Sequence, residues 1–329
     1  MKLAFALSGS RNAATAVEVA RTVEAAGLDE VWVTEDYCER GAFSLAGALL
    51  ATTSRVAVGI GVVNPWTRHP MLTAMEAGCL NELAPGRLLL GLGASNPHWM
   101  DHQLGIPFEQ PLTRLRESVE ILRLALSGEP VVHEGTAQSI DTQLSFSPGT
   151  PPIILGVKGP KALALAGAVA DGVLLSVLSS PQYVRWAQQQ LGSRQDLALA
   201  SYIAVRIGDD RHAVRERTRP FVAKFLGVHG VHPITEQAGI PPELAQQFRQ
   251  GWQAGTPRSD LVTDQILDTV AIAGDRDDVA AGLRRFADAG LATAVIHEEV
   301  TQDQTRMLDQ VQAAAVDAGL SPGAGVVAS

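Results

Sequence analysis

Two adjacent acids, Glu35 and Asp36, follow the apolar run EVWVT and are the first residues in this chain that could do chemistry. Neighbouring side chains of a strand point to opposite faces, so one carboxyl would face a site while the other faces away. A carboxyl in such a place can give or take a proton during a reaction. The alternative is that both acids cap the helix that follows. The pair alone leaves both interpretations open.

The segment Lys158-Gly159-Pro160-Lys161 is a second candidate, because it joins the apolar run PIILGV to a helical pattern. Gly159 lets a ligand approach the backbone closely. Pro160 suits the first turn of a helix, whose free N–H groups attract anions. With two lysines beside them, we favour a phosphate site over a plain strand-to-helix turn with solvated lysines.

Histidines and cysteines do not form a convincing metal site. His98 and His102 have the spacing of a pair on one helix face, but the residues around them indicate an irregular loop, and no His-Glu-x-x-His motif is present. Cys38 and Cys79 are far apart and form no Cys-x-x-Cys pair. We therefore expect no metal and no disulfide framework, and a reducing cytoplasm fits the cysteine usage.

Short apolar runs must position these residues. There are eight of them: KLAFAL, EVWVTE, VAVGIGVV, RLLLGLG, PIILGV, GVLLSV, ALASYIAV and TAVIH. Unbroken apolar runs are typical of parallel strands buried on both faces, and helical patterns that end near glycine lie between them. Eight strand–helix units predict an α/β fold, a (β/α)8 barrel. A doubly wound sheet is the alternative, but the first run is not followed by Gly-x-Gly-x-x-Gly.

We expect a single barrel domain over residues 1–329, with insertions after strand four (95–112) and after strand seven (227–260). A small hairpin is expected within 129–148, and a loose tail at 319–329. Working residues of such barrels lie at the carboxyl ends of the strands. Besides the acids and the lysine loop, that position falls on Ser8, Asn64, Ser95, Asn96, Trp99 and Ser176.

Composition excludes several classes of partner. The formal charge is −9 and no long run has one sign, so we expect no nucleic acid. No apolar run reaches the roughly 18 residues of a membrane span, so we expect no membrane contact. The opening segment MKLAFALSGS is interpreted as the first strand rather than as a signal peptide.

Three segments taken together resemble the luciferase-like flavin superfamily: GVVNPWTRHP, TAMEAGCLNELAPGRLLLGLGA and GVKGPKALALAGAVADGVLL. They look most like its branch of coenzyme F420-dependent methylenetetrahydromethanopterin reductases, and the likeness runs over nearly the whole chain. The resemblance implies a (β/α)8 barrel with a flavin or deazaflavin across its mouth, and a homodimer. It also implies a non-prolyl cis peptide at the end of strand three, which falls on Gly61-Val62.

The resemblance implies further roles by position. The family's acid after strand two falls on Glu35, and Asp36 stands where relatives often carry histidine. Asn96 stands where a sugar-phosphate dehydrogenase relative has glutamate, and the family's phosphate loop falls on residues 158–161. Strand one lacks the glutamate of the pterin-reducing relatives, and reads Ala4 to Leu7 instead. These departures indicate a retained redox scaffold with altered substrate chemistry.

We therefore expect an oxidoreductase that uses coenzyme F420 to move a hydride to or from a small organic molecule, by reduction of a C=N or C=C bond. An FMN-dependent luciferase-like monooxygenase is the alternative. Catalytic roles are expected for Glu35, Asp36 and Asn96, with Glu35 as the favoured proton donor and Asp36 as the alternate. Substrate contacts are expected for Ser8 and Trp99. The expected cofactor contacts are Gly61, Val62, Asn64, Ser95, Lys158, Gly159, Pro160, Lys161 and Ser176.

Overall fold

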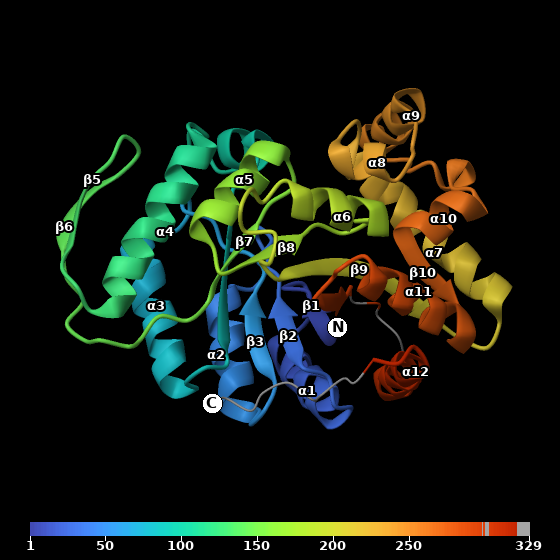
Figure 1. Ribbon diagram of the computed structural model, residues 1–329, viewed down its shortest axis with the longest axis horizontal. Coiled ribbons are helices and arrows are strands. Elements are labelled where there is room, and N and C mark those ends of the chain that lie inside the picture. The colour runs from blue at the N-terminus through green and yellow to red at the C-terminus, as the bar shows by residue number, and fades with distance from the viewer. Residues whose placement is uncertain (298, 300–302, 321–329) are drawn as a thin grey trace.

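Eight parallel strands close into a barrel in the computed structural model, which describes residues 1–297, 299 and 303–320 (Figure 1). Around the barrel they are β1 (Lys2–Leu7), β2 (Glu30–Val33), β3 (Ala57–Ile60), β4 (Leu88–Gly93), β7 (Ile153–Gly156), β8 (Gly172–Leu175), β9 (Leu199–Ile207) and β11 (Thr293–Ile296). β11 pairs with β1 and closes the ring. The predicted (β/α)8 barrel is confirmed, and each strand lies within one of the eight apolar runs except β9, which continues two residues past its run.

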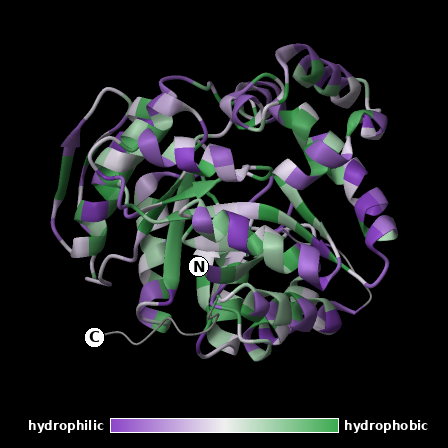
Figure 2. Ribbon diagram, turned by 45° about the vertical axis from the view of Figure 1, so that its right-hand side comes forward, coloured by the Kyte–Doolittle hydropathy of each residue, from purple (hydrophilic) through white to green (hydrophobic). Residues whose placement is uncertain are grey.

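Helices follow the strands and cover the outside of the barrel (Figure 1). They are α1 (Ala13–Ala25), α2 (Ala42–Thr52), α3 (Pro70–Leu83), α4 (Pro111–Ser127), α5 (Pro160–Val169), α6 (Pro181–Gln189), α7 (Arg211–His229) and α11 (Arg276–Asp288). Four of them begin with proline, as the fixed φ of that residue favours. Figure 2 shows the hydrophobic residues gathered along the central strands and the hydrophilic ones on the surrounding helices.

The barrel interior is filled by apolar side chains around the large ring of Trp32. Trp32 of β2 packs there with Ala4, Ala6 and Ala200, and its Nε1 donates to Glu30 Oε2 at 2.8 Å. A Cβ on Gly59 would lie 2.4 Å from the Trp32 ring, so glycine is required beside it. The barrel is thus a packed core, and only its rim is available for a site.

The predicted hairpin within 129–148 is confirmed as β5 (Val131–Glu134) and β6 (Ser139–Thr142), which pair antiparallel beside α4, away from the barrel (Figure 1). Glu117 of α4 holds its turn. The buried carboxylate accepts the backbone N–H groups of Thr136 and Gln138, each at 2.9 Å. These bonds lower the pKa of Glu117 although burial alone would raise it.

Both expected insertions contain structure that the sequence patterns did not reveal. The first contains a π-helix, His98–Gln103. The second contains α8 (Pro233–Gln237) and α9 (Pro242–Gln253), and leads through a 3-10 turn (Ser259–Leu261) and α10 (Asp264–Val270) into an additional strand, β10 (Ala271–Gly274). β10 runs parallel to the second half of β9, outside the barrel. The four-residue run AIAG is too short to be identified as a strand by pattern alone.

The C-terminal region contains one further helix, α12 (Gln304–Asp317), which packs against α11 and α1. The expected loose tail at 319–329 lies outside the described residues except for Gly319 and Leu320. No helix in the described part of the chain has the length and apolar character needed to cross a membrane.

Candidate functional site

The peptide bond between Gly61 and Val62, just beyond β3, is cis, as the family resemblance predicted. It lies at the mouth, by which we mean the end of the barrel where the strands reach their carboxyl ends. Tyr202 Oη, from β9, donates to the Gly61 carbonyl at 2.8 Å. Glycines of β4 and β7 make room for Val62, since a Cβ on Gly93 or Gly156 would lie 2.6 or 2.9 Å from its methyl groups. The end of β3 is therefore seated directly on the barrel core.

Tyr37 joins three of the predicted site residues. Its hydroxyl donates to Ser95 Oγ at 3.0 Å and accepts a hydrogen bond from Asn64 Nδ2. The Trp99 ring meets the Tyr37 ring nearly edge-on, with centroids 5.0 Å apart. The ends of β2, β3 and β4 are thereby tied together on one side of the mouth. Tyr37 was not among the predicted site residues. The one sign of its role in the sequence is its place directly after the two acids, as an aromatic residue with a hydroxyl group.

The structure separates the two adjacent acids. Glu35 Oε2 accepts the backbone N–H of Ala42 at 2.9 Å, at the start of α2, and lies 3.6 Å from Arg68 Nη2. Arg68 in turn pairs with Glu76 at 2.6 Å. The capping interpretation therefore describes the contacts of Glu35.

Asp36 lies just past the end of β2, and its side chain is exposed. Protein atoms around the carboxyl nevertheless raise its pKa by burial. A hydrogen bond from Thr34 and the charge of Lys224, on α7, act in the opposite direction. The Asp36 charge also adds to the effect of burial in raising the pKa of Tyr202, the residue bonded to Gly61. Of the two acids, Asp36 is the one placed beside the end of β3.

Ser8 lies at the same rim, at the end of β1. Its Oγ is 2.7 Å from Ser10 Oγ and 3.5 Å from Glu39 Oε2. Burial raises the pKa of Glu39, and the Asp36 charge raises it further. The predicted substrate residue Ser8 is therefore part of a polar rim that Asp36 and Glu39 share.

The loop after β7 combines open backbone with a partly enclosed lysine. Tyr183 Oη of α6 donates to the Lys158 carbonyl at 2.5 Å. Gly159 precedes α5, and no atom lies within 4 Å of the position that a Cβ would occupy there. Lys158 reaches solvent, but burial lowers its pKa, and the charge of Arg249 lowers it further. Lys161 is exposed. This chemistry suits an anion at the start of α5.

Two predicted residues have mainly local contacts. Asn96 Oδ1 accepts the backbone N–H of Trp99 at 3.0 Å, in the first turn of the π-helix. Ser176, at the end of β8, is half-buried, and its carbonyl accepts a hydrogen bond from Ser179 Oγ at 2.6 Å. Asn96 therefore positions Trp99.

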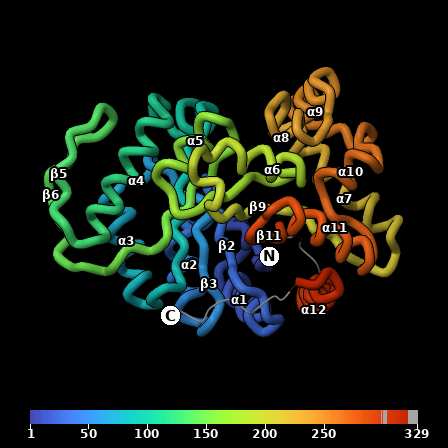
Figure 3. Tube along the Cα trace, in the orientation of Figure 1, coloured from blue at the N-terminus to red at the C-terminus, as the bar shows by residue number. Residues whose placement is uncertain are grey.

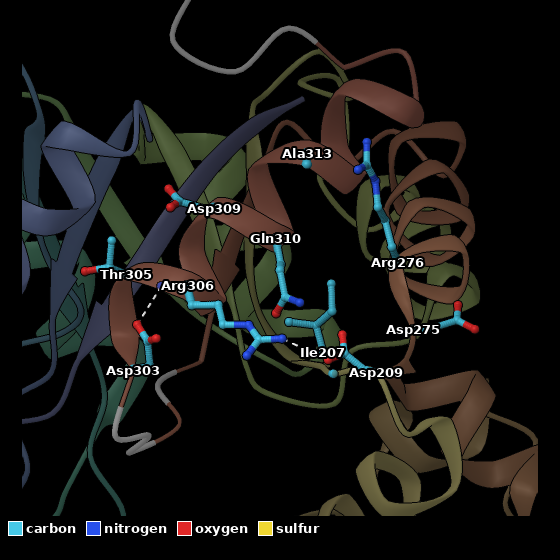
Figure 4. A pocket seen from close by; sticks show the side chains of 11 residues that line it. Ile207, Asp209, Asp275, Arg276, Asp303, Thr305, Arg306, Asp309, Gln310 and Ala313 are labelled. Carbon is cyan, nitrogen blue, oxygen red and sulfur yellow. Dashed lines mark hydrogen bonds and ion pairs between the residues drawn. The ribbon is translucent and has the colours of Figure 1, made fainter.

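A groove of about 770 Å³ lies apart from the mouth, between β9, α11 and α12 (Figure 4). Its polar lining is already paired in part, since Arg306 Nη2 lies 2.8 Å from Asp209 Oδ2. None of the predicted site residues lines this groove. Within the described ranges, no group of three or more His, Cys, Asp or Glu side chains is arranged to hold a metal ion.

Comparisons with known proteins identify the family of this chain. The model of the luciferase-like monooxygenase family matches residues 3–293. A 5,10-methylenetetrahydromethanopterin reductase of Archaeoglobus fulgidus is 31% identical over 307 residues, which cover 88% of this chain and 91% of the relative. An F420-dependent glucose-6-phosphate dehydrogenase of Tsukamurella paurometabola is 28% identical over 320 residues, covering 90% of this chain and 91% of the relative.

A solved structure shares the fold. The coenzyme F420-dependent tetrahydromethanopterin reductase of Methanopyrus kandleri superposes with a TM-score of 0.86 at 24% identity, and covers 96% of this chain and 98% of that one. The family match over most of the chain and the 31% identity carry the assignment. The chain belongs to the luciferase-like monooxygenase family.

Proposed function

We propose that the chain is a coenzyme F420-dependent oxidoreductase that moves a hydride between the deazaflavin ring and a small organic molecule. One observation supports the proposal: the end of β3 at Gly61-Val62, which packs against Tyr202, and the open backbone at Gly159 lie at the same end of the barrel. These suit the two ends of a ring-and-phosphate cofactor. Relatives of this chain that are F420-dependent by name favour the deazaflavin.

Each side chain then has a role. Gly61 and Val62 support the ring, and Asn64 and Ser95, joined through Tyr37, offer polar groups beside it. Ser176 borders the cofactor at the end of β8, and residues 158–161 hold the phosphate. When bound, the deazaflavin supplies a ring carbon that carries the hydride, and the protein supplies position and the proton.

Asp36 is the proposed proton donor. Reduction of a C=N or C=C bond adds a hydride to one atom and a proton to the other, so a group near neutral pKa is needed at the mouth. Burial raises the pKa of Asp36 in that direction. Ser8 and Trp99 border the substrate, on either side of this acid. We propose reduction of an electron-poor C=N or C=C bond.

The choice of cofactor is testable by binding. We expect coenzyme F420 to bind at least about tenfold more tightly than FMN, a difference of about 1.4 kcal/mol. The measurement is a titration of the purified protein with each cofactor under identical conditions. Equal affinities, or FMN retained through purification, would contradict the proposal and favour the monooxygenase alternative.

We also propose a homodimer that pairs through the outer face of α3. Leu72, Met75 and Leu83 are 52%, 50% and 54% exposed, and Cys79 between them is exposed as well. Their spacing places all four on one face of the helix, which we call the α3 stripe. An apolar stripe on one helix can pair with its own copy about a two-fold axis, which makes the contact self-complementary.

Met75→Glu is expected to convert the dimer to a monomer, because the two-fold axis places the new charge in the interface twice. Sedimentation should give twice the 34.8 kDa chain mass for the unmodified protein and the chain mass for the variant. Val316→Glu is the matched control, since Val316 is 61% exposed on α12. A monomeric unmodified protein, or equal behaviour of the two variants, would refute pairing through the α3 stripe.

We place the protein in the cytoplasm. Cys38 and Cys79 are both free and exposed thiols. Reducing compartments keep such thiols from forming disulfides.

A further inference from the structure

We infer that the rings of Phe221, Phe225 and His297 form one side of the substrate pocket, and that this aromatic wall makes the enzyme favour flat cyclic substrates over open-chain ones. The inference rests on the proposed function and deepens it, since it concerns the molecule that exchanges the hydride. Phe221 and Phe225 belong to α7, which packs against β9 and β10 (Figure 3). His297 directly follows β11.

The alternation of side chains along β11 points His297 toward the mouth. Val295 of β11 lies in the barrel interior with Trp32. Side chains two positions apart on a strand share a face, so His297 stands on the inner face, one layer closer to the mouth than Val295. Its backbone N–H donates to the Ile203 carbonyl at 2.8 Å, which continues the pairing of β11 with β9 by one residue. His297 is half-buried, as a residue at the rim of the mouth should be.

Two hydrogen bonds place α7 along the rim between β9 and β8. In the first half of the helix, Arg217 Nη2 donates to the carbonyl of the last residue of β9 at 3.0 Å. At its end, His229 Nε2 lies 2.8 Å from the carbonyl oxygen of Val177, just past β8. Phe221 and Phe225 lie between these two points, and their spacing of four puts them on one face of the helix. Their ring centroids are 4.7 Å apart.

The three rings meet one another directly. The His297 centroid lies 4.8 Å from that of Phe221 and 5.8 Å from that of Phe225, and both pairs meet edge-on. The His297 ring also meets the edge of the Tyr202 ring, with centroids 6.4 Å apart. Tyr202 Oη in turn donates to the Gly61 carbonyl at the end of β3. The aromatic wall therefore adjoins the place proposed for the deazaflavin ring.

Exposure distinguishes the aromatic wall from the aromatic residues of the core. Phe248 and Phe286 are 0% and 1% exposed. The rings of the wall pack against one another, but each residue keeps part of its surface exposed. A partly exposed aromatic cluster at the mouth is the kind of lining that ligand pockets use.

Arg206 holds the aromatic wall in one geometry. This arginine is 4% exposed, and its Nη1 donates to the His297 carbonyl at 2.9 Å. Its guanidinium lies over the Phe221 ring, 5.0 Å from the centroid. Its Nε lies 3.4 Å from Glu299 Oε2. One buried cation thus links the end of β11 to a ring of α7, so the wall has little freedom to lose when a ligand packs against it.

The order of the strands brings the aromatic wall near the proposed proton donor. β9, β11, β1 and β2 follow one another round the barrel. His297, Ser8 and Asp36 therefore come from the ends of three neighbouring strands. A substrate that reaches Asp36 can lie against the rings on the β11 side. Flat π systems pack well on such rings, whereas an open chain must first give up its rotational freedom. The wall hence favours a ring that contains the reacting C=N or C=C bond.

The experiment compares a flat cyclic enone with an open-chain enone of the same number of carbons. Dissociation constants are measured by ligand-observed NMR, with and without oxidised coenzyme F420, so that no turnover is needed. We expect the unmodified protein to bind the cyclic enone about tenfold more tightly, a difference of about 1.4 kcal/mol. His297→Leu should weaken binding of the cyclic enone by about fivefold or more and that of the open-chain enone by less than about twofold. His297→Phe keeps an aromatic ring and should retain most of the preference.

His212→Leu, at an exposed histidine in the first turn of α7, is the control and should change neither affinity. Thermal unfolding checks that each variant is folded. Equal losses for both enones in His297→Leu would show a merely structural role. No loss in that variant, or no preference in the unmodified protein, would remove the aromatic wall from the substrate pocket.

The conservative variant separates the ring surface from the chemistry of the imidazole. If His297→Phe loses as much affinity as His297→Leu, the imidazole nitrogens make the contact and the inference is wrong. If the unmodified protein prefers the cyclic enone but does not bind coenzyme F420, the aromatic wall stands and the proposed function fails. If it binds coenzyme F420 but neither enone, the cofactor assignment stands and the aromatic wall is wrong.

Discussion

Asp36→Asn is expected to lower turnover by about 100-fold or more, the usual loss when a general acid is removed. The amide keeps the shape and hydrogen bonds of the carboxyl but has no transferable proton. Affinity for coenzyme F420 should change little, because Asp36 is assigned to the substrate side of the mouth. Turnover can be followed by the absorbance of the reduced deazaflavin, with a cyclic imine and a cyclic enone as probes of the two bond types.

The pH profile gives a separate readout of the same role. Burial raises the pKa of Asp36, so the carboxyl keeps its proton to a higher pH than a free aspartate does. Turnover that depends on this proton is complete below the raised pKa and declines as the pH rises through it. Asp36→Asn should abolish that decline along with most of the activity.

Glu35→Gln is the matched comparison. The glutamine can still accept the N–H of Ala42, so we expect turnover to stay near that of the unmodified enzyme. If Glu35→Gln loses turnover and Asp36→Asn does not, the proton role belongs to Glu35. If both variants are fully active, the proton comes from solvent or from the substrate, and no side-chain acid is needed.

Gly61→Ala is expected to lower the free energy of unfolding by about 1–3 kcal/mol, as added atoms do in a packed core. The new Cβ would lie 2.3 Å from Tyr202 Oη, 3.0 Å from the Trp32 ring and 3.1 Å from Leu174 Cδ2. Trp32 and Leu174 belong to the barrel interior and have little room to move. Denaturant unfolding measures the loss, and titration should show weaker binding of coenzyme F420 because the ring seat shifts.

A double-mutant cycle isolates the cause. Tyr202→Phe removes the nearest atom, and alone it should cost about 1 kcal/mol for the lost hydrogen bond to Gly61. In the Gly61→Ala background it should cost less or restore stability, because it relieves the contact. Gly47→Ala, inside α2 and against the flexible end of Leu80, should change stability by no more than about 1 kcal/mol. Strict additivity in the cycle would mean that crowding at Tyr202 is not the cause.

The barrel was predictable because its signals are local. The strands fall on short apolar runs. Asp36, Asn64 and Ser95 follow the ends of β2, β3 and β4, which lie side by side in the barrel. The cis peptide at Gly61-Val62 was predictable from family resemblance, since no spacing rule marks it.

The partners within the site were not predictable, because they depend on contacts distant in sequence. Tyr37 meets Ser95 across 58 positions and Asn64 across 27, and no periodicity links these residues. The partners of Glu35 and Asp36 likewise follow from the path of the chain after β2.

The long strand β9 has a consequence for how this enzyme could diversify. Its first half belongs to the barrel and its second half pairs with β10, where the Gly208 N–H donates to the Gly274 carbonyl at 3.1 Å. The segment from α7 to α10 thus starts after β9 and ends before β10, and these two strands are paired with each other. The entropy of closing such a loop grows only slowly with its length. Evolution can therefore lengthen or exchange this segment while the strand ends that carry Asp36, Asn64 and Ser95 stay the same.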